Sequence, residues 1–456
     1  MLKEKMMPLT PESPLPVLVI GGGPVGLAAA AHLATRGLSF LVLEAGGHVA
    51  DSVRRWGHVR MFSPWRYNTD KAARALLERA GWVAPDPEHL PTGRELLRDY
   101  LEPLAAVPQI APHLRLGVRA IALGREAQDK VSDAGRADLP FLVQVQTADG
   151  AVETLRAAAV IDCSGTWTAP NPLGAGGYAV PGEAAAADRF AYGIPDVLGG
   201  DRAAYAGRRV LVVGSGHSAI NVLLDLLALK QEAPETAIAW AVRRADPQRA
   251  FAGGAADALP ARGDLGSRAK AAVEEGAVTL LAPFRATAVE QGKDGGALTV
   301  SGTGAAGPVS TIADRVVVAT GFRPALSFLR EVRLGLDPAL ECAAALAPLI
   351  DPNLHSCGTV RPHGARDLAH PEPDFYIAGM KSYGRAPTFL LATGHEQVRS
   401  IVAMLAGDRQ AADKVELELP ETGICNTQLA GAVAPVLADT GGGCCPAPKK
   451  PVSCCG

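Results

Sequence analysis

Residues 17–31 have the sequence VLVIGGGPVGLAAAA, in which an apolar run passes through a glycine-rich turn into a segment of small residues. This order predicts a buried strand, a tight turn and the start of a helix. Gly21 permits the turn, Gly23 lets a phosphate approach the backbone, and Gly26 allows close packing of helix on strand. Because the free N–H groups and the positive dipole end of a helix face its N-terminus, the turn favours a pyrophosphate.

A second apolar run, residues 40–43, ends in Glu44. An acid at this distance from the glycine turn binds the ribose hydroxyls of a dinucleotide. A turn that serves only helix packing is the alternative, but the features that occur in the expected order favour a dinucleotide site. The candidate residues of this site are Gly21, Gly23, Pro24, Gly26 and Glu44.

The same pattern occurs again at residues 210–219, VLVVGSGHSA, before an apolar helix predicted at residues 220–229. Two such units predict either binding sites for two dinucleotides or one duplicated domain. The next predicted strand, residues 237–242, is followed by Arg243 and Arg244, where an NAD site would place an acid. A guanidinium suits the 2′-phosphate of NADP, although a solvated surface pair is the alternative. His217 and Ser218 either cap the helix near a pyrophosphate or form an ordinary structural cap.

The remaining segments predict further helices and strands. Helices are predicted at residues 71–80 and 94–106, the second capped near Thr92, and a final helix at 389–405 with Pro387 in its first position. Alternating residues predict antiparallel meanders at 117–155 and 278–300. Apolar strands are predicted at 157–162, 315–318 and 374–379. Residues 46–68 predict a long loop over a cofactor.

Composition limits the function further. The chain has 456 residues, which predicts two or three domains, and its formal net charge of −3 gives no indication of nucleic-acid binding. No apolar run is long enough to span a membrane, and the first 16 residues lack the core of a signal peptide. These features predict a cytoplasmic protein with a small-molecule partner. The first of eight cysteines is Cys163, predicted to be a buried small side chain.

The order of these parts resembles flavoproteins with two dinucleotide-binding domains, most closely the single-component, NADPH-dependent flavin-containing monooxygenases, over residues 15–410. The resemblance implies an α/β fold with two Rossmann-like domains. It further implies a FAD domain at 15–170 and 320–420 that is interrupted by an NADPH domain at 171–319. Residues 1–14 are expected to form a flexible N-terminus. Residues 421–456 have too few apolar residues to pack and are expected to form a disordered tail.

In that family, hydride passes from NADPH to FAD, and O2 then forms a flavin C4a-(hydro)peroxide that oxygenates a soft sulfur, nitrogen or arsenic centre. The resemblance implies catalytic contacts from Asn68, with Tyr67 and Trp65 beside it, although the two aromatic residues could equally pack under a lid. The remaining cofactor candidates are Trp56, Arg60, Gly165, Gly214, Gly216, Thr320, Gly321, Gly379 and Thr388.

Two departures from the family patterns bear on the chemistry. Residues 171–213 lack the histidine that the monooxygenase fingerprint carries before the second glycine turn. Disulfide reductases share the architecture but need two cysteines that this chain lacks before Cys163. The alternatives are an NADPH-dependent reductase or oxidase without oxygen insertion, or a redox protein that binds a soft metal. A monomer or a homodimer is expected.

The C-terminal segment carries two adjacent cysteine pairs, Cys444 with Cys445 and Cys454 with Cys455, on either side of two lysines. Neighbouring Cα atoms lie closer than an unstrained disulfide prefers, so each pair suits a shared soft ion better. Thiolates bind As(III), Hg(II), Cu(I) and Zn(II). The ending resembles the vicinal cysteine pair of mercuric reductases and predicts capture of arsenic, or secondly mercury. A redox-sensitive or merely tolerated tail is the alternative.

Overall fold

The computed structural model describes residues 14–251, 260–355, 360–386 and 389–417. The described residues contain two five-stranded parallel sheets. The first sheet has the order β16-β7-β1-β2-β3. Its strands are β16 (Phe375–Ile377), β7 (Ala159–Asp162), β1 (Val17–Ile20), β2 (Phe40–Glu44) and β3 (Leu114–Leu116).

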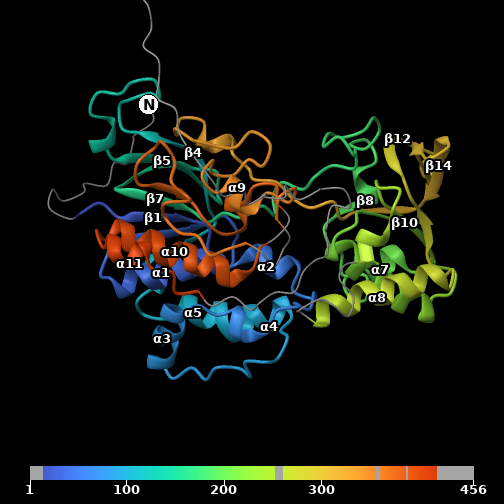
Figure 1. The fold of residues 1–456 in the computed structure, drawn as a ribbon, viewed down its shortest axis with the longest axis horizontal. Coiled ribbons are helices and arrows are strands. Elements are labelled where there is room, and N and C mark those ends of the chain that lie inside the picture. The colour runs from blue at the N-terminus through green and yellow to red at the C-terminus, as the bar shows by residue number, and fades with distance from the viewer. Residues whose placement is uncertain (1–13, 252–259, 356–359, 387–388, 418–456) are drawn as a thin grey trace, which may run out of the picture. The chain divides into compact units, whose positions relative to one another are not determined.

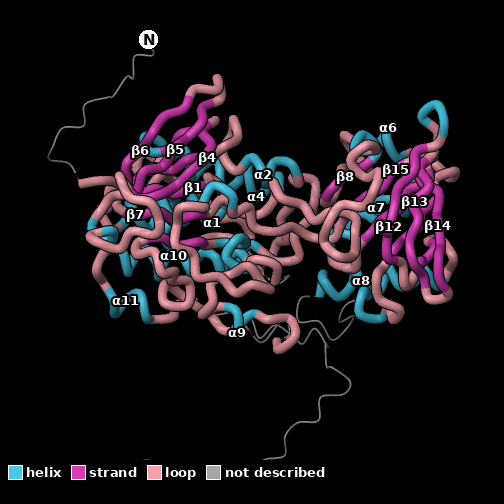
Figure 2. Tube along the Cα trace, turned by 90° about the horizontal axis from the view of Figure 1, so that it is seen from above, coloured by secondary structure: helices cyan, strands magenta, loops and turns pink. Residues whose placement is uncertain are grey.

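Alternate residues of β1 enter two different cores. Val17 and Val19 pack with helices α1 (Pro24–Thr35) and α10 (Leu391–Leu405), which lie side by side in Figure 1. Leu18 and Ile20 instead pack with the antiparallel strands β4 (Val118–Arg125), β5 (Phe141–Thr147) and β6 (Val152–Ala157). Figure 2 shows these three strands beside β1. Because strand side chains alternate, a fully apolar strand is buried on both faces.

The second sheet repeats this arrangement. Its order is β11-β10-β9-β15-β8, formed by β11 (Thr279–Leu281), β10 (Ala237–Ala241), β9 (Arg209–Val213), β15 (Arg315–Val318) and β8 (Phe190–Tyr192). Val210 and Val212 of β9 share a core with α7 (His217–Glu232), against which α8 (Pro260–Glu274) packs. Leu211 and Val213 face the antiparallel strands β12 (Arg285–Gln291), β13 (Leu298–Gly304) and β14 (Gly307–Ala313).

The predicted α/β class with two Rossmann-like units is confirmed by these sheets. The residues of the second sheet and its meander all fall between the β7 and β16 strands of the first sheet. The domain boundaries themselves stay a prediction. Of the predicted N-terminal segment 1–14, the structure describes Pro14 alone. The predicted tail, residues 421–456, lies outside the described residues.

Several elements differ from the prediction. Residues 279–281 form β11, which pairs in parallel with β10 and is therefore not part of the meander. Residue 157 ends β6, and β7 begins at Ala159. The loop at 46–68 contains the short helix α2 (Asp51–Arg55). Helix α10 begins at Leu391, so Pro387, which lies outside the described residues, is not its first residue.

The two helices predicted before the first meander are present. Helix α3 (Lys71–Arg79) begins at an Asp70 cap that accepts a hydrogen bond from the Ala73 N–H. The segment at 94–106 contains α4 (Gly93–Leu96), a π turn (Leu97–Leu101) and α5 (Glu102–Ala106). Thr92 and Glu95 form a reciprocal capping box before α4, which satisfies two N–H groups of the first turn. The remaining short helices are α6 (Arg202–Tyr205), α9 (Ala347–Ile350) and α11 (Arg409–Asp413).

Among the described residues, no helix combines the length and the apolar character needed to span a bilayer.

Candidate functional site

The first glycine turn connects β1 to α1. Gly21 has a φ of +105°, and a Cβ added there would lie 2.6 Å from the carbonyl oxygen of Cys163. A Cβ added to Gly26 would lie 1.9 Å from the carbonyl oxygen of Gly21. Both positions therefore require glycine, the first for conformation and close strand packing and the second for contact between helix and turn.

Gly23 differs from these two glycines because its added Cβ would meet no atom within 4 Å. It is the N-cap of α1, and Pro24 takes the first helical position, where a missing N–H costs nothing. Open space directly before a helix N-terminus is where a pyrophosphate binds. This position fits the predicted phosphate contact of a dinucleotide.

Glu44 lies beside this turn at the end of β2. Its carboxylate accepts hydrogen bonds from the N–H groups of Gly22 at 2.9 Å and Gly46 at 2.8 Å. Burial raises the pKa of Glu44 above its usual value, while the two N–H donors act in the opposite direction. The carboxylate is therefore held at the turn, on the edge of the sheet where dinucleotides bind.

Two further predicted residues lie at the same edge. Gly165 follows β7, has a φ of +68°, and has open space at the position of its missing Cβ. Gly379 follows β16 with a φ of +74°, and its added Cβ would lie 3.2 Å from Val25 in the first turn of α1. A Cβ added to Gly394 in α10 would also lie close to Val25, 2.6 Å from its side chain. Gly379 and Gly394 thus bring the segment that follows β16 and the first turn of α10 against the start of α1. Thr388 lies outside the described residues.

The second glycine turn connects β9 to α7, as the first connects β1 to α1. Gly214 has a φ of +137°, and its added Cβ would lie 2.3 Å from the carbonyl oxygen of Ala319, which directly follows the neighbouring strand β15. Gly216 is the N-cap of α7 and, like Gly23, has open space around the missing Cβ. His217 and Ser218 form the first helical positions, and the His217 ring lies 5.4 Å from that of Phe62.

The register of the strands shows what stands in place of Glu44 in the second sheet. Gly21 donates to the carbonyl of Leu43, the residue before Glu44, and Gly214 donates to the carbonyl of Ala241, the residue before Val242. Val242 is buried and carries no charge. Arg243 and Arg244 follow it, both exposed and without an ion pair in the described part of the chain. An acid that would repel a 2′-phosphate is absent from this register position.

Thr320 and Gly321 lie where the chain returns from the second sheet. The side chain of Asn171 donates to the Thr320 carbonyl at 3.0 Å, and its N–H donates to the Gly321 carbonyl at 2.9 Å. Phe322 stacks on Trp167, with ring centroids 5.0 Å apart. The two segments that connect the sheets therefore pair with each other.

The predicted site residues of the 46–68 loop contact other protein groups. Trp56 packs on Gly93, where an added Cβ would lie 2.6 Å from its ring, and exposed Arg60 donates to the Leu90 carbonyl. Trp65 is buried. Tyr67 is half-buried beneath the Arg66 guanidinium, which lies 4.8 Å from its ring. These contacts are made within the polypeptide, and the roles predicted for these residues stay predictions.

Asn68 is fully buried, and its amide is bonded locally. The nitrogen donates to the carbonyls of Ser63 at 2.7 Å and Pro64 at 3.1 Å, and the oxygen accepts from the Ser63 hydroxyl at 2.9 Å. Asn68 thus fixes the turn that carries Trp65 and Tyr67. Its predicted contact with the flavin stays a prediction.

The described cysteines Cys163 and Cys342 are both unpaired and buried, as predicted for Cys163. Burial raises the pKa of the Cys163 thiol well above its usual value and that of Cys342 to about 12. Buried thiols with raised pKa values are poor nucleophiles. The described residues contain no group of three or more His, Cys, Asp or Glu that could hold a metal ion, and Cys444, Cys445, Cys454 and Cys455 lie outside them.

The sequence did not identify one buried charge cluster at this edge of the first sheet. Lys381 Nζ lies 2.6 Å from Asp162 Oδ2, and both side chains are 0% exposed. Ser164 completes the cluster through hydrogen bonds to both partners. The available signals were a carboxylate at the end of an apolar strand and a single lysine between an apolar strand and an apolar helix.

Comparison with protein families gives a match at residues 18–344 to the family described as pyridine nucleotide-disulphide oxidoreductase. The matched region is more than half of the chain and contains both glycine turns. The chain belongs to this family. It is therefore an oxidoreductase, and family membership together with the two turns supports FAD and NADPH as its cofactors.

Two curated relatives are monooxygenases. Rifampicin monooxygenase of Streptomyces venezuelae is 34% identical over 37% of this chain and 35% of its own length. Indole-3-pyruvate monooxygenase YUCCA1 of Oryza sativa subsp. japonica is 31% identical over 46% of this chain and 44% of its own length. The chain thus spans less than half the length of these relatives.

Solved structures with the same fold include two kinds of enzyme. Bacillithiol disulfide reductase from Bacillus cereus has a TM-score of 0.64 at 18% identity, covering 87% of this chain and 99% of its own. The FAD-bound cadaverine monooxygenase of desferrioxamine biosynthesis from Erwinia amylovora has a TM-score of 0.60 at 13% identity, covering 90% of this chain and 100% of its own. At these identities the comparison establishes the fold.

Proposed function

We propose that this protein is an NADPH-dependent flavin monooxygenase that oxygenates a soft sulfur, nitrogen or arsenic centre. NADPH supplies two electrons, one atom of O2 enters the substrate, and the other leaves as water. The observation that carries the proposal is the pair of glycine turns, each between a buried strand and a helix, the second of which lacks an acid and is followed by the exposed residues Arg243 and Arg244. Two curated relatives that are monooxygenases favour this activity over a disulfide reductase.

The residues of the chain would bind and orient the cofactors. The N-terminus of α1 with Gly23 would hold the FAD pyrophosphate, and Glu44 the adenosine ribose. The N-terminus of α7 with Gly216 would hold the NADPH pyrophosphate. Bound FAD supplies the electron transfer from NADPH to O2. The proposed place of Asn68, Trp65 and Tyr67 is beside the flavin, and a cytoplasmic location and a monomeric or dimeric state remain expectations.

The first prediction tests oxygen insertion. Anaerobically NADPH-reduced protein mixed rapidly with O2 should show a transient flavin spectrum that differs from both the reduced and the oxidised cofactor. The measurement is stopped-flow absorbance, with peroxide assayed at the end. Direct return to oxidised flavin with one peroxide per NADPH would instead identify the alternative, an oxidase without oxygen insertion.

Coenzyme choice gives the second prediction. Replacing Arg243 and Arg244 by Gln should lower the preference for NADPH over NADH, because a charge-assisted phosphate contact contributes about 1.5–3 kcal/mol, roughly tenfold to a hundredfold. The measurement is the rate of flavin reduction against the concentration of each coenzyme. Arg208→Gln is the control. Arg208 is also exposed, but it lies before the amino end of β9, whereas Arg243 and Arg244 follow the carboxyl end of β10. Equal use of NADH and NADPH by the unmodified protein would contradict the assignment.

The third prediction concerns the cysteine pairs of the tail, which favour a second role in capturing arsenic. As(III) titrated into the reduced protein should bind tightly to the full chain and weakly to a variant ending at Pro420, because vicinal thiolates chelate soft ions. Calorimetry measures the difference, and flavin absorbance checks that the shortened protein is intact. Equal, weak binding by both proteins would leave a flavin oxidoreductase without metalloid capture.

A further inference from the structure

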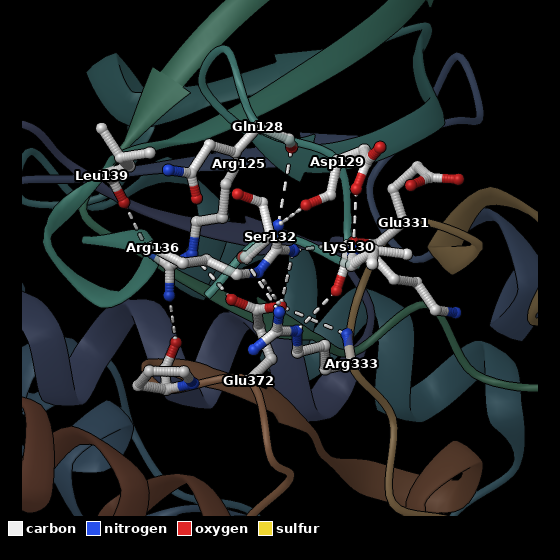
Figure 3. Close-up of polar contacts among 12 residues, drawn as sticks. Arg125, Gln128, Asp129, Lys130, Ser132, Arg136, Leu139, Glu331, Arg333 and Glu372 are labelled. Carbon is white, nitrogen blue, oxygen red and sulfur yellow. Dashed lines mark hydrogen bonds and ion pairs between the residues drawn. The ribbon is translucent and has the colours of Figure 1, made fainter. Parts of the chain in front are cut away.

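Strand β16 has a buried ion pair at each end. At its carboxyl end, Lys381 Nζ lies 2.6 Å from Asp162 Oδ2, and Asp162 is the last residue of the neighbouring strand β7. At its amino end, Glu372 accepts from Arg125 Nε and Arg136 Nη2, both at 2.8 Å (Figure 3). All five side chains are at most 3% exposed. Burying charges in this way is costly unless the geometry is well satisfied.

Asp162 fixes the turn that follows β7. Its Oδ1 accepts hydrogen bonds from the Ser164 N–H at 3.0 Å and the Ser164 hydroxyl at 2.6 Å. The same turn carries the Cys163 carbonyl against which Gly21 packs, at 2.6 Å from an added Cβ. Asp162 therefore sets the position of the backbone that borders the first glycine turn.

Lys381 joins this turn to the segment Gly379–Tyr383, which follows β16. Besides Asp162, its ammonium donates to the Ser164 hydroxyl at 3.1 Å. The next residue, Ser382, accepts from Gln397 Nε2 of α10 at 2.9 Å, and Gln397 Oε1 accepts from the Gly379 N–H at 2.8 Å. The segment is thus tied to β7 by Lys381 and to α10 by Gln397.

The two buried charge clusters lie at opposite edges of the sheet, and only one of these edges is where ligands bind. Ligands of parallel α/β sheets bind outside the carboxyl ends of the strands. The Lys381–Asp162 pair lies at that edge, directly under exposed Ser164. The Arg125–Glu372–Arg136 cluster lies at the amino end of the same strand and holds the loop between β4 and β5, through Arg136 donating to the Asp129 carbonyl at 2.8 Å.

We propose that Lys381 and Asp162 are positioning residues for FAD. They hold the turn at 163–165 and the segment Gly379–Tyr383 together at the edge where the dinucleotide binds. The proposal rests on the FAD assignment of the proposed function. The Lys381–Asp162 pair thus supports the affinity for FAD. The Arg125–Glu372–Arg136 cluster at the amino end of β16 supports the stability of the fold.

The test measures the dissociation constant of FAD for the apoprotein of each variant, from the change in flavin fluorescence on titration. Lys381→Met and Asp162→Asn should each weaken FAD binding by about tenfold or more. Glu372→Gln is the matched control, because it also breaks a buried ion pair next to β16. It should lower the thermal stability of the apoprotein while leaving FAD affinity within about threefold.

The double variant Asp162→Asn with Lys381→Met removes both charges. It should recover apoprotein stability relative to the single variants, because no unpaired charge stays buried, and yet bind FAD as weakly as they do. Unchanged FAD affinity in the single variants, or equal weakening by Glu372→Gln, would overturn the positioning role. An unmodified protein that does not bind FAD would overturn the proposed function itself and this inference with it.

Discussion

The Gly23→Leu variant is expected to be a folded, colourless protein. A side chain at this position meets no protein atom within 4 Å of its Cβ, and the backbone of Gly23, with a φ of −80°, is one that leucine adopts readily. The side chain would instead fill the space of the pyrophosphate. We expect FAD affinity to fall by at least about a hundredfold, because the contact to the helix N-terminus is lost.

Two measurements separate this effect from misfolding. The thermal unfolding of the apoprotein should match that of the unmodified apoprotein, while flavin absorbance after purification should be lost. Gly26→Leu is the contrasting variant, because its Cβ would lie 1.9 Å from the Gly21 carbonyl oxygen and should destabilise the fold itself. A Gly23→Leu protein that keeps its full flavin absorbance would show that the pyrophosphate binds elsewhere.

The Gly216→Leu variant should lose its response to NADPH and keep its flavin. Gly216 also has open space at its missing Cβ and a φ of −94°, so leucine fits the fold and blocks the second pyrophosphate site. We expect the rate of flavin reduction at limiting NADPH to fall by at least about a hundredfold.

Dithionite provides the control for this variant, because it reduces flavin without binding at the second turn. Normal reduction by dithionite together with slow reduction by NADPH would place the defect in coenzyme binding. Ser215→Ala, an exposed neighbour in the same turn, should behave as the unmodified protein. Reduction of Gly216→Leu by NADPH at the usual rate would contradict the assignment of the second turn.

The glycine turns could be predicted from sequence because each depends on local backbone constraints. Gly21 and Gly214 need left-handed φ values, and the apolar strands before them are buried on both faces, so composition and order together predict both features. The cap at Thr92 was predictable for the same reason, since it uses residues three positions apart.

Long-range pairing could not be predicted in the same way. Residues 279–281 form a sheet strand because β10 lies beside them, and nothing in their own sequence separates this from a hairpin. The contact between Lys381 and Asp162 joins residues 219 positions apart, and each looks unexceptional in its own segment. The local hydrogen bonds of Asn68 depend on carbonyl groups whose direction only the folded turn sets.

The interrupted first sheet has a consequence for synthesis on the ribosome. Strand β16 and helix α10 are translated after every strand of the second sheet. Until they emerge, β7 has one unpaired edge and the apolar side of α1 has no α10 to cover it. The second sheet can complete its core during translation, whereas the nascent first sheet exposes a parallel strand edge, a surface on which chaperones act and on which aggregation begins.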